Sequence, residues 1–514
     1  MDALPFAPAA ALLAAAVFAG SRRAWLIEGL ALAALASAIA LAAVLVVVGP
    51  VTTPLIGIDG VGLSARRDVV GVSLLLLITF VGWIVVRFTA TYLDGEPRAG
   101  FFIRWLCLTL ASVMAMVVAG NLVQLVVAWV ATSLALHRLL LFYPTRPGAQ
   151  RAARKKFIAA RGADAALIAA AVLLTVAYRT TDIATILVDA RGGVAPNLAA
   201  AAAACLAVAA MLKSAQFPLH GWLTEVMEAP TPVSALLHAG VINAGGFVLI
   251  RFADVMLLSP AALALLVLFG GFTALFGGLV MLTQPAVKTS LAWSTVAQMG
   301  FMTMECGLGL FPLALLHLVA HSLYKAHSFL AAGSAVERIV AARRPGPVAV
   351  PSAGAVGRAF AVAIGLYAAI GAAFGISSAP PQAIVLGAIL IFGVAYLIAQ
   401  GLAEAAPRAL TRRLVVASGA ASLGYFLLHA LATRLTADVL PVPPSPSSLD
   451  WALMILATLS FGSVAVAQAL FPLWSGHPAV AVLRVHLSNG LYANAVLDRL
   501  LGGWRRPVSA EFGR

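Results

Sequence analysis

Ionisable side chains inside long apolar runs are the first feature of this sequence that points to chemistry. Lys213 is followed five residues later by Pro218, and His238 lies in the next apolar run. A charge at bilayer depth costs several kcal/mol, so ionisable groups there are functional candidates. Proline breaks a helix, and the freed backbone groups are tolerated where they line a polar cavity. Residues 211–246 are therefore predicted to form a site where a proton or cation is exchanged.

A second set of ionisable residues lies in HLVAHSLYKAHSF, residues 317–329. His317, His321 and Lys325 recur at every fourth position, which places them along one face of a helix. Histidine changes its charge near neutral pH, so this face has the geometry of a proton relay. Two histidines four residues apart also have zinc-ligand spacing, but the sequence offers no third ligand nearby. The pattern favours a relay over a metal site.

Plainer roles remain open for these side chains. Lys213 can extend its amine to the nearby membrane interface, and His238 can simply hydrogen-bond a neighbouring helix. Glu225 and Glu228 lie between the two runs, where they face either Lys213 or cytoplasmic water. We take Glu225 as the partner of Lys213, either structural or at the point where protons enter.

A scaffold of membrane-spanning helices must position these residues. The 514 residues are 62% hydrophobic and 10% charged, with a mean hydropathy of +1.01. That balance excludes the soluble classes and predicts an all-α polytopic membrane protein. A span needs about 20 apolar residues, which gives about fifteen transmembrane helices. We expect them near residues 4–20, 25–49, 69–91, 101–119, 121–143, 158–178, 197–215, 232–253, 261–282, 290–310, 312–336, 357–376, 383–403, 412–433 and 450–472.

The sequence has no pattern for a cofactor of its own. The motifs GxxxxGK[ST], CxxC and HExxH do not occur, and Cys107, Cys205 and Cys306 lie in apolar runs without metal-ligand spacing. We therefore expect no cofactor and no metal in this chain. It should be a transporter subunit and not an enzyme.

The net charge of +14 would suggest nucleic acid for a soluble protein, but here the basic residues lie in short loops. An N-terminus outside and a C-terminus in the cytoplasm place most of them on the cytoplasmic side, including the predicted loop of residues 146–161. We therefore expect no nucleic-acid partner. Residues 151–156 could also bind membrane lipid or a partner, although a topology signal is favoured.

Three stretches resemble motifs of a known family. KSAQFPLHGWLTEVMEAPTPVSALLHAG, VKTSLAWSTVAQMGFM and HLVAHSLYKAHSFLAAGS are similar, in order, to motifs of the antiporter-like membrane subunits, the NuoL-type subunits of respiratory complex I and the Mrp antiporter subunits. The resemblance covers roughly residues 70–340. It implies two inverted five-helix repeats with broken helices, and a proton path through Lys213, His238 and Lys325 with His317 and His321 on the relay.

The resemblance also implies a division of the chain into four parts. These are N-terminal helices over 1–100, a first repeat over 101–255, a second over 256–435, and a last span with an amphipathic tail over 436–514.

Two departures from the family stand out. Val130 follows Trp129 where the family carries a glutamate, and the second half lacks a mid-span lysine, with Gln400 and Glu404 its polar candidates.

The short form with the tail LSNGLYANAVLDRLLG most resembles the DabB family, membrane subunits of bacterial inorganic carbon transporters. This implies an inner-membrane subunit that passes a cation, H⁺ by expectation, and a DabA-type soluble zinc protein that hydrates CO₂ to bicarbonate. The alternatives are a proton-pumping subunit of a complex I-like or hydrogenase complex, an Mrp-type Na⁺/H⁺ antiporter subunit, and a structural anchor without conduction.

Overall fold

The computed structural model describes residues 2–20, 24–334, 352–375, 379–401 and 408–500, and most of them lie in helices. Ten of the described helices are long and apolar enough to cross a membrane. Only helices and closed barrels satisfy their backbone groups in lipid, so a chain this apolar folds as helices. The all-helical class is confirmed, but the number of fifteen spans is not. The predicted division at residues 100, 255 and 435 stays a prediction.

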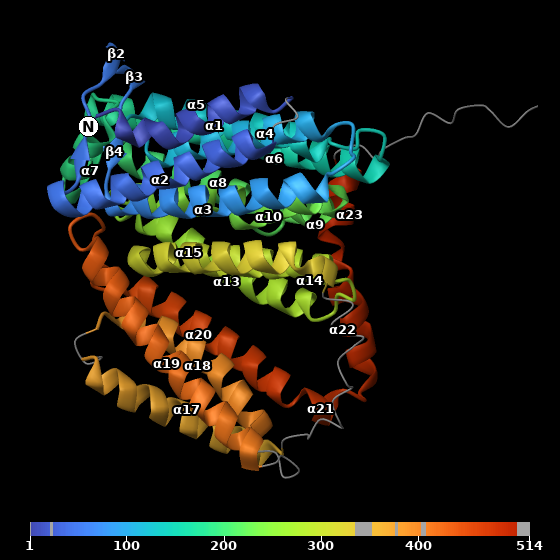
Figure 1. Cartoon of the computed structure of the whole chain (residues 1–514). Helices are drawn as coiled ribbons and strands as arrows, with labels where there is room; N and C mark the ends of the chain where they lie inside the picture. Colours follow the sequence, from blue (N-terminus) through green and yellow to red (C-terminus); the bar gives the residue numbers. More distant parts are fainter. Residues whose placement is uncertain (1, 21–23, 335–351, 376–378, 402–407, 501–514) are drawn as a thin grey trace, which may run out of the picture.

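The first half of the chain forms one packed group (Figure 1). After the 3-10 turn η1 (Leu4–Phe6) come α1 (Ala7–Phe18), α2 (Ala24–Val48), α3 (Val69–Tyr92), α4 (Ala99–Val117), α5 (Leu122–Leu140) and α6 (Pro147–Tyr178). The predicted loop of residues 146–161 is wrong, because the helix begins at Pro147, a residue suited to the first turn. The small side chains of Ala152 and Ala153 are buried and let this part of α6 pack closely.

Short strands close one end of this group, which we call the hairpin end. β1 (Val51–Thr52) pairs antiparallel with β4 (Arg66–Arg67), and β2 (Ile56–Ile58) with β3 (Val61–Leu63). The turn before α7 (Ile183–Arg191) lies at the same end, since Thr181 donates to the carbonyl of Gly60. We call the opposite end, where α6 begins, the basic end.

Two helices are interrupted inside the bundle. α8 (Ala199–Lys213) ends at Lys213, and helix resumes only in α9 (Gly221–Glu225) and the turn η2 (Val226–Glu228). α10 (Thr231–Ala239) ends at Gly240 and passes through the turn η3 (Val241–Asn243) into α11 (Ala244–Arg251) and α12 (Ala253–Met256). The predicted break after Lys213 is confirmed, and its cause is the sequence SAQFP, in which proline cannot continue the hydrogen-bond ladder.

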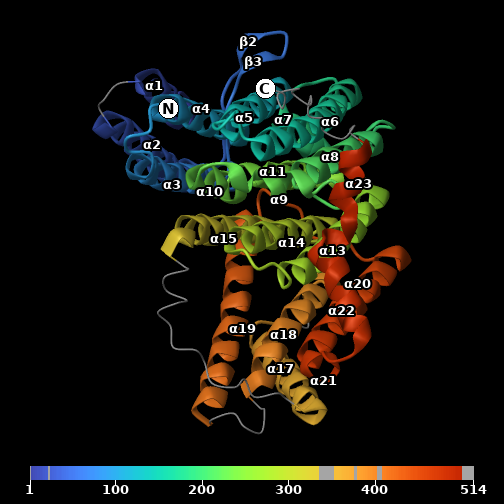
Figure 2. The same ribbon diagram turned by 90° about the vertical axis from the view of Figure 1, so that its right-hand side faces the viewer.

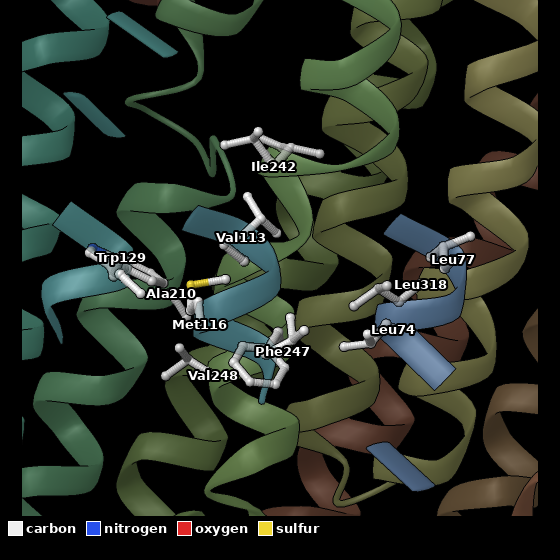
Figure 3. Packing of buried hydrophobic residues seen from close by; sticks show 14 of the residues in the cluster. Leu74, Leu77, Val113, Met116, Trp129, Ala210, Ile242, Phe247, Val248 and Leu318 are labelled. Carbon is white, nitrogen blue, oxygen red and sulfur yellow. The ribbon is translucent and has the colours of Figure 1, made fainter. Parts of the chain in front are cut away.

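Apolar packing holds the second broken helix in place (Figure 3). Its buried side chains lie against three other helices: Val113 and Met116 come from α4, Leu74 and Leu77 from α3, and Leu318 from α15 (Phe311–Leu330). Close packing of this kind fixes where the interrupted backbone lies.

The remaining helices form two further layers (Figure 1). α13 (Pro260–Met281) and α14 (Val287–Gly307) lie beside α15, and below them is a tilted group of α17 (Ala353–Ala373), α18 (Pro381–Gly401), α19 (Arg408–Thr436) and α20 (Ser448–Ala469). The C-terminal segment then runs across the basic end (Figure 2) as α21 (Phe471–Trp474), α22 (Pro478–Ser488), η5 (Gly490–Tyr492) and α23 (Ala493–Leu500).

A buried ion pair fastens the broken helix at the hairpin end. Both guanidinium Nη atoms of Arg251, the last residue of α11, donate to the Asp68 carboxylate, which caps α3 by accepting from the Gly71 amide. Burial alone would raise the pKa of Asp68, but the charges of Arg251 and Arg66 outweigh it and lower the pKa to about 2. The carboxylate is therefore ionised near neutral pH.

Removing the charge of Asp68 should destabilise the fold. Asp68→Asn leaves Arg251 buried without its counter-charge, and breaking a buried pair costs about 3–5 kcal/mol. The apparent melting midpoint of the purified protein, followed by the soluble monodisperse fraction after heating, should fall clearly. The control is Glu28→Gln, whose pair with Arg87 is partly exposed and 3.7 Å long, so its midpoint should move much less. Equal midpoints for the two variants would refute this role of the pair.

Candidate ion-translocation site

The break after α8 leaves Lys213 at the centre of a buried polar cluster. The Lys213 amine lies 4.3 Å from the centre of the Trp129 ring. Trp129 on α5 donates from Nε1 to Oδ1 of Asp164 on α6, at 2.9 Å. Oδ2 of Asp164 in turn lies 2.5 Å from the guanidinium of Arg161. The four residues come from three helices, and Asp164 is close enough to Lys213 for their charges to interact.

A second buried lysine faces the same cluster. Lys156 on α6 is 4% exposed and donates to the carbonyl and the hydroxyl of Ser133, at 2.6 and 3.1 Å. Its charge and that of Lys213 repel each other. Between the two lysines lies a cavity with about 10 Å³ in which the centre of a water molecule can lie, which is room for about one water. The Lys213 amine has no hydrogen-bond partner within the described protein, so a water there would serve it.

Asp164 supplies the carboxylate that the sequence seemed to lack. Val130 is indeed apolar and half-buried, but the neighbouring Trp129 reaches a carboxylate on α6 in place of one on its own helix. The signal was present in the sequence, since Asp164 is an acidic residue in an alanine-rich run. It was missed because its helix was expected to begin only near residue 158, which placed Asp164 close to a helix end.

Glu225 does not pair with Lys213, and that prediction is wrong. Its carboxylate accepts from Lys155 at 2.7 Å and lies 3.5 Å from Arg151, both at the start of α6. Asn494 of α23 also donates to Glu225. The reason is the path of α9, which carries Glu225 away from the break and towards the basic end, where α6 presents its cations.

The second predicted set of residues comes together around α14 and α15. The His238 ring stacks on Phe329 with centroids 4.3 Å apart, and its Nδ1 lies 3.0 Å from the hydroxyl of Thr295. Thr295 donates to the Leu291 carbonyl, which also accepts from the Lys325 amine at 3.1 Å. His238 and Lys325 are both fully buried. A hydroxyl and a carbonyl of α14 thus connect the histidine of α10 with the lysine of α15.

His317 and His321 continue from Lys325 along the same face of α15, as the spacing predicted. Their rings lie 6.2 Å apart, and neither ring nitrogen of His321 has a partner among the described residues. Glu305 of α14, which the sequence reasoning missed, lies 2.9 Å from Nδ1 of His317. The expectation that no carboxylate lies near the histidines is therefore wrong. The described residues nevertheless contain no group of three side chains suited to hold a metal ion.

The second helix break lies between these two sets of residues. The Ser214 hydroxyl, next to Lys213, donates to the Ile242 carbonyl at 3.3 Å. Asn243 donates to the Ser322 hydroxyl on α15 at 2.8 Å. Backbone carbonyls and small polar side chains therefore extend from Lys213 towards α15. The side chains of Gln400 and Glu404 lie outside the described residues.

Comparison with known proteins identifies the family of the chain. The family described as NADH:quinone oxidoreductase/Mrp antiporter matches residues 119–406. The probable inorganic carbon transporter subunit DabB2 of Halothiobacillus neapolitanus is 41% identical over 452 residues, covering 86% of this chain and 81% of the relative. The probable subunit DabB of Hydrogenovibrio crunogenus is 48% identical over 286 residues, covering 54% of this chain and 55% of that protein.

A solved structure shows the same fold. A chain of the Mrp complex from Dietzia sp. superposes with a TM-score of 0.59 at 25% identity, covering 96% of this chain and 56% of that one. The antiporter-like fold is therefore confirmed, as is a transporter subunit in a membrane. The chain belongs to the antiporter-like membrane subunits shared by NADH:quinone oxidoreductases and Mrp antiporters, and within them to the DabB inorganic carbon transporter subunits.

Proposed function

We propose that this chain conducts protons across the bacterial inner membrane and uses their flow to drive inorganic carbon accumulation. A DabA-type soluble zinc partner would hydrate CO₂ to bicarbonate. The observation that carries the proposal is a row of ionisable groups that leads from Lys156 and Lys213, through the second helix break, to Lys325, His321 and His317. All of them are buried except His317, which is partly buried. An apolar bundle gains no stability from such groups, so they point to transport.

In this proposal the basic end faces the cytoplasm and the hairpin end faces outwards. The C-terminal segment lies at the basic end, as a cytoplasmic C-terminus requires, and the basic residues at the start of α6 follow the positive-inside bias. Protons running down their gradient then enter from the hairpin side. Each transfer breaks the bond of the proton to its donor atom and forms a bond to the acceptor atom, and the histidines and lysines are regenerated for the next proton.

The two lysines act together at the break of α8, where Lys213 ends that helix and Lys156 faces it from α6. Lys213 lines a water-sized cavity and its amine has no hydrogen-bond partner within the described residues, so it can exchange a proton with a water there. Asp164 stabilises the charged form of Lys213, while the nearby charge of Lys156 opposes it. A proton arriving at one lysine would therefore favour its departure from the other.

The partner would meet the chain at the basic end. Asn494 and Asp498 of α23 both bind Lys155, which also holds Glu225. The C-terminal segment thus contacts Lys155 of α6 and Glu225 of α9, and α9 follows directly after the break at Lys213. This location lets a soluble partner and the ion path act on each other.

Lys213→Ala should abolish transport. In cells that express the chain with its partner, uptake of radiolabelled bicarbonate should fall to the level of cells without the chain, because the path loses its group at the helix break. Lys288→Ala is the matched control, since Lys288 binds Thr231 at the basic end and lies off the path. Undiminished uptake by Lys213→Ala, with normal amounts of protein, would rule out conduction and leave a structural anchor.

Asp164→Asn should slow transport on the order of tenfold, equivalent to about 1.4 kcal/mol, because Lys213 loses its counter-charge. The amide can still accept from Trp129, so the protein should fold. Asp164→Glu should recover part of the rate. Asp94→Asn, at an exposed carboxylate between α3 and α4, is the control and should transport normally. A rate equal to that of the unmodified chain in Asp164→Asn would refute this role.

Purification of the assembled complex separates the proposal from its alternative. We expect a soluble zinc-containing protein to copurify with the chain. Subunits of a quinone reductase, or several other Mrp subunits, would instead favour proton pumping in a complex I-like assembly or Na⁺/H⁺ antiport.

A further inference from the structure

Glu305 is a buried carboxylate to which the function proposed above gives no part. It is 4% exposed and lies two residues before the end of α14 at the hairpin end. Its Oε2 lies 2.9 Å from Nδ1 of His317, which is six residues from the start of α15 at the same end. We call the row of His317, His321 and Lys325 on α15 the histidine stripe. Glu305 thus contacts the end of this stripe that lies nearest the hairpin end.

A polar face on α19 lies beside this pair. Ser418, Ser422, Tyr425 and His429 follow one another at intervals of four, three and four residues, which places them on one side of the helix. Tyr425 packs against an apolar cluster that contains Met304 and Leu313. Met304 directly precedes Glu305, and Leu313 lies one helical turn before His317. Its ring lies 5.8 Å from that of His429, one turn nearer the hairpin end.

Unpaired atoms on this face point to water or a moving proton. The hydroxyls of Tyr425 and Ser418 are buried and have no hydrogen-bond partner within the described residues, and Nε2 of His317 has none either. Buried polar atoms are nearly always paired, so such a set needs an explanation. The Tyr425 hydroxyl also lies within range of the charge on Glu305.

We propose that Glu305 is the outermost proton carrier of the histidine stripe and that it exchanges protons with the hairpin side through Tyr425 and His429 of α19. This rests on the proposed function. An incoming proton forms an O–H bond on the Glu305 carboxylate. The carboxyl then gives it to Nδ1 of a neutral His317, breaking that O–H bond and forming an N–H bond. His317 passes a proton on towards His321 and Lys325, and Glu305 returns to its ionised form.

This arrangement takes the place of the mid-span lysine that the family resemblance leads one to expect in the second half. A carboxylate on α14 reaches the stripe from the side, so the path leaves the middle layer and enters the tilted group at α19. The path still consists of ionisable groups in a row, but its outermost group, Glu305, comes from α14 and not from α15.

Glu305→Gln tests the proposal in the complex of the full chain with its partner. Glutamine keeps the size and a hydrogen bond to His317 but cannot carry a proton. We expect bicarbonate uptake, and proton influx measured with a pH-sensitive dye in proteoliposomes, to fall at least as far as in Asp164→Asn. Partner copurification and the melting midpoint should stay the same. Glu305→Asp should restore part of the flux, which a purely structural role does not require.

Tyr425→Phe is the second variant, and it tests the proposal if the Glu305→Gln protein does not accumulate in the membrane. It removes only the hydroxyl and should lower the flux severalfold. Tyr324→Phe, at an exposed ring on α15, and Glu228→Gln, at the basic end, are the matched controls and should leave it unchanged. Normal flux in Glu305→Gln or Tyr425→Phe, together with loss of flux in Lys213→Ala, would overturn this inference alone. Normal flux in Lys213→Ala as well would overturn the proposed function.

Discussion

The interaction between Asp164 and the cations around it is the one on which the rest of the structure depends. Arg161 bonds to this carboxylate directly, and Lys213 and Lys156 lie within range of its charge. Moving charges from water into an apolar interior is expensive, and one carboxylate cannot compensate three cations. The cluster therefore places more positive than negative charge in an apolar interior, which is the setting that the proposed proton transfer uses.

Close helix packing keeps this cluster and the histidine stripe in a fixed relation. A Cβ atom at Gly300 of α14 would lie 2.5 Å from the backbone nitrogen of Ala274 on α13, so no larger residue fits. Small residues that let helices approach closely are the usual contact in membranes. The contact fixes α14, and α14 carries the three groups that contact Lys325, His238 and His317: Leu291, Thr295 and Glu305. Packing between helices thus sets the spacing of the polar groups.

Much of the fold could be predicted because lipid leaves a chain few choices. Apolar runs predict the helices, and Pro218 predicts the break beside Lys213. The spacing of His317, His321 and Lys325 gave the stripe on α15, since it depends only on the helical repeat. What failed were pairings between helices. Glu225 was assigned to Lys213, and Asp164 and Glu305 were overlooked, because a partner on another helix depends on how the helices pack.

The same limit explains the errors of local structure. The many charges at the start of α6 predict a loop, yet its buried alanines and the pairing of Lys155 with Glu225 and Asp498 stabilise a helix there. The strands of the hairpin end have two or three residues each, too few to give a periodic pattern. These strands lie between α2 and α3.

The central claim is that protons cross this chain and drive carbon accumulation. Proteoliposomes containing the chain with its partner can be given an inside-negative membrane potential at equal pH on both sides, in a sodium-free buffer with CO₂ supplied outside. The account predicts that the interior acidifies and bicarbonate accumulates there, and that Lys213→Ala and a protonophore each abolish the accumulation. Accumulation that requires a sodium gradient, or that survives Lys213→Ala, would contradict it.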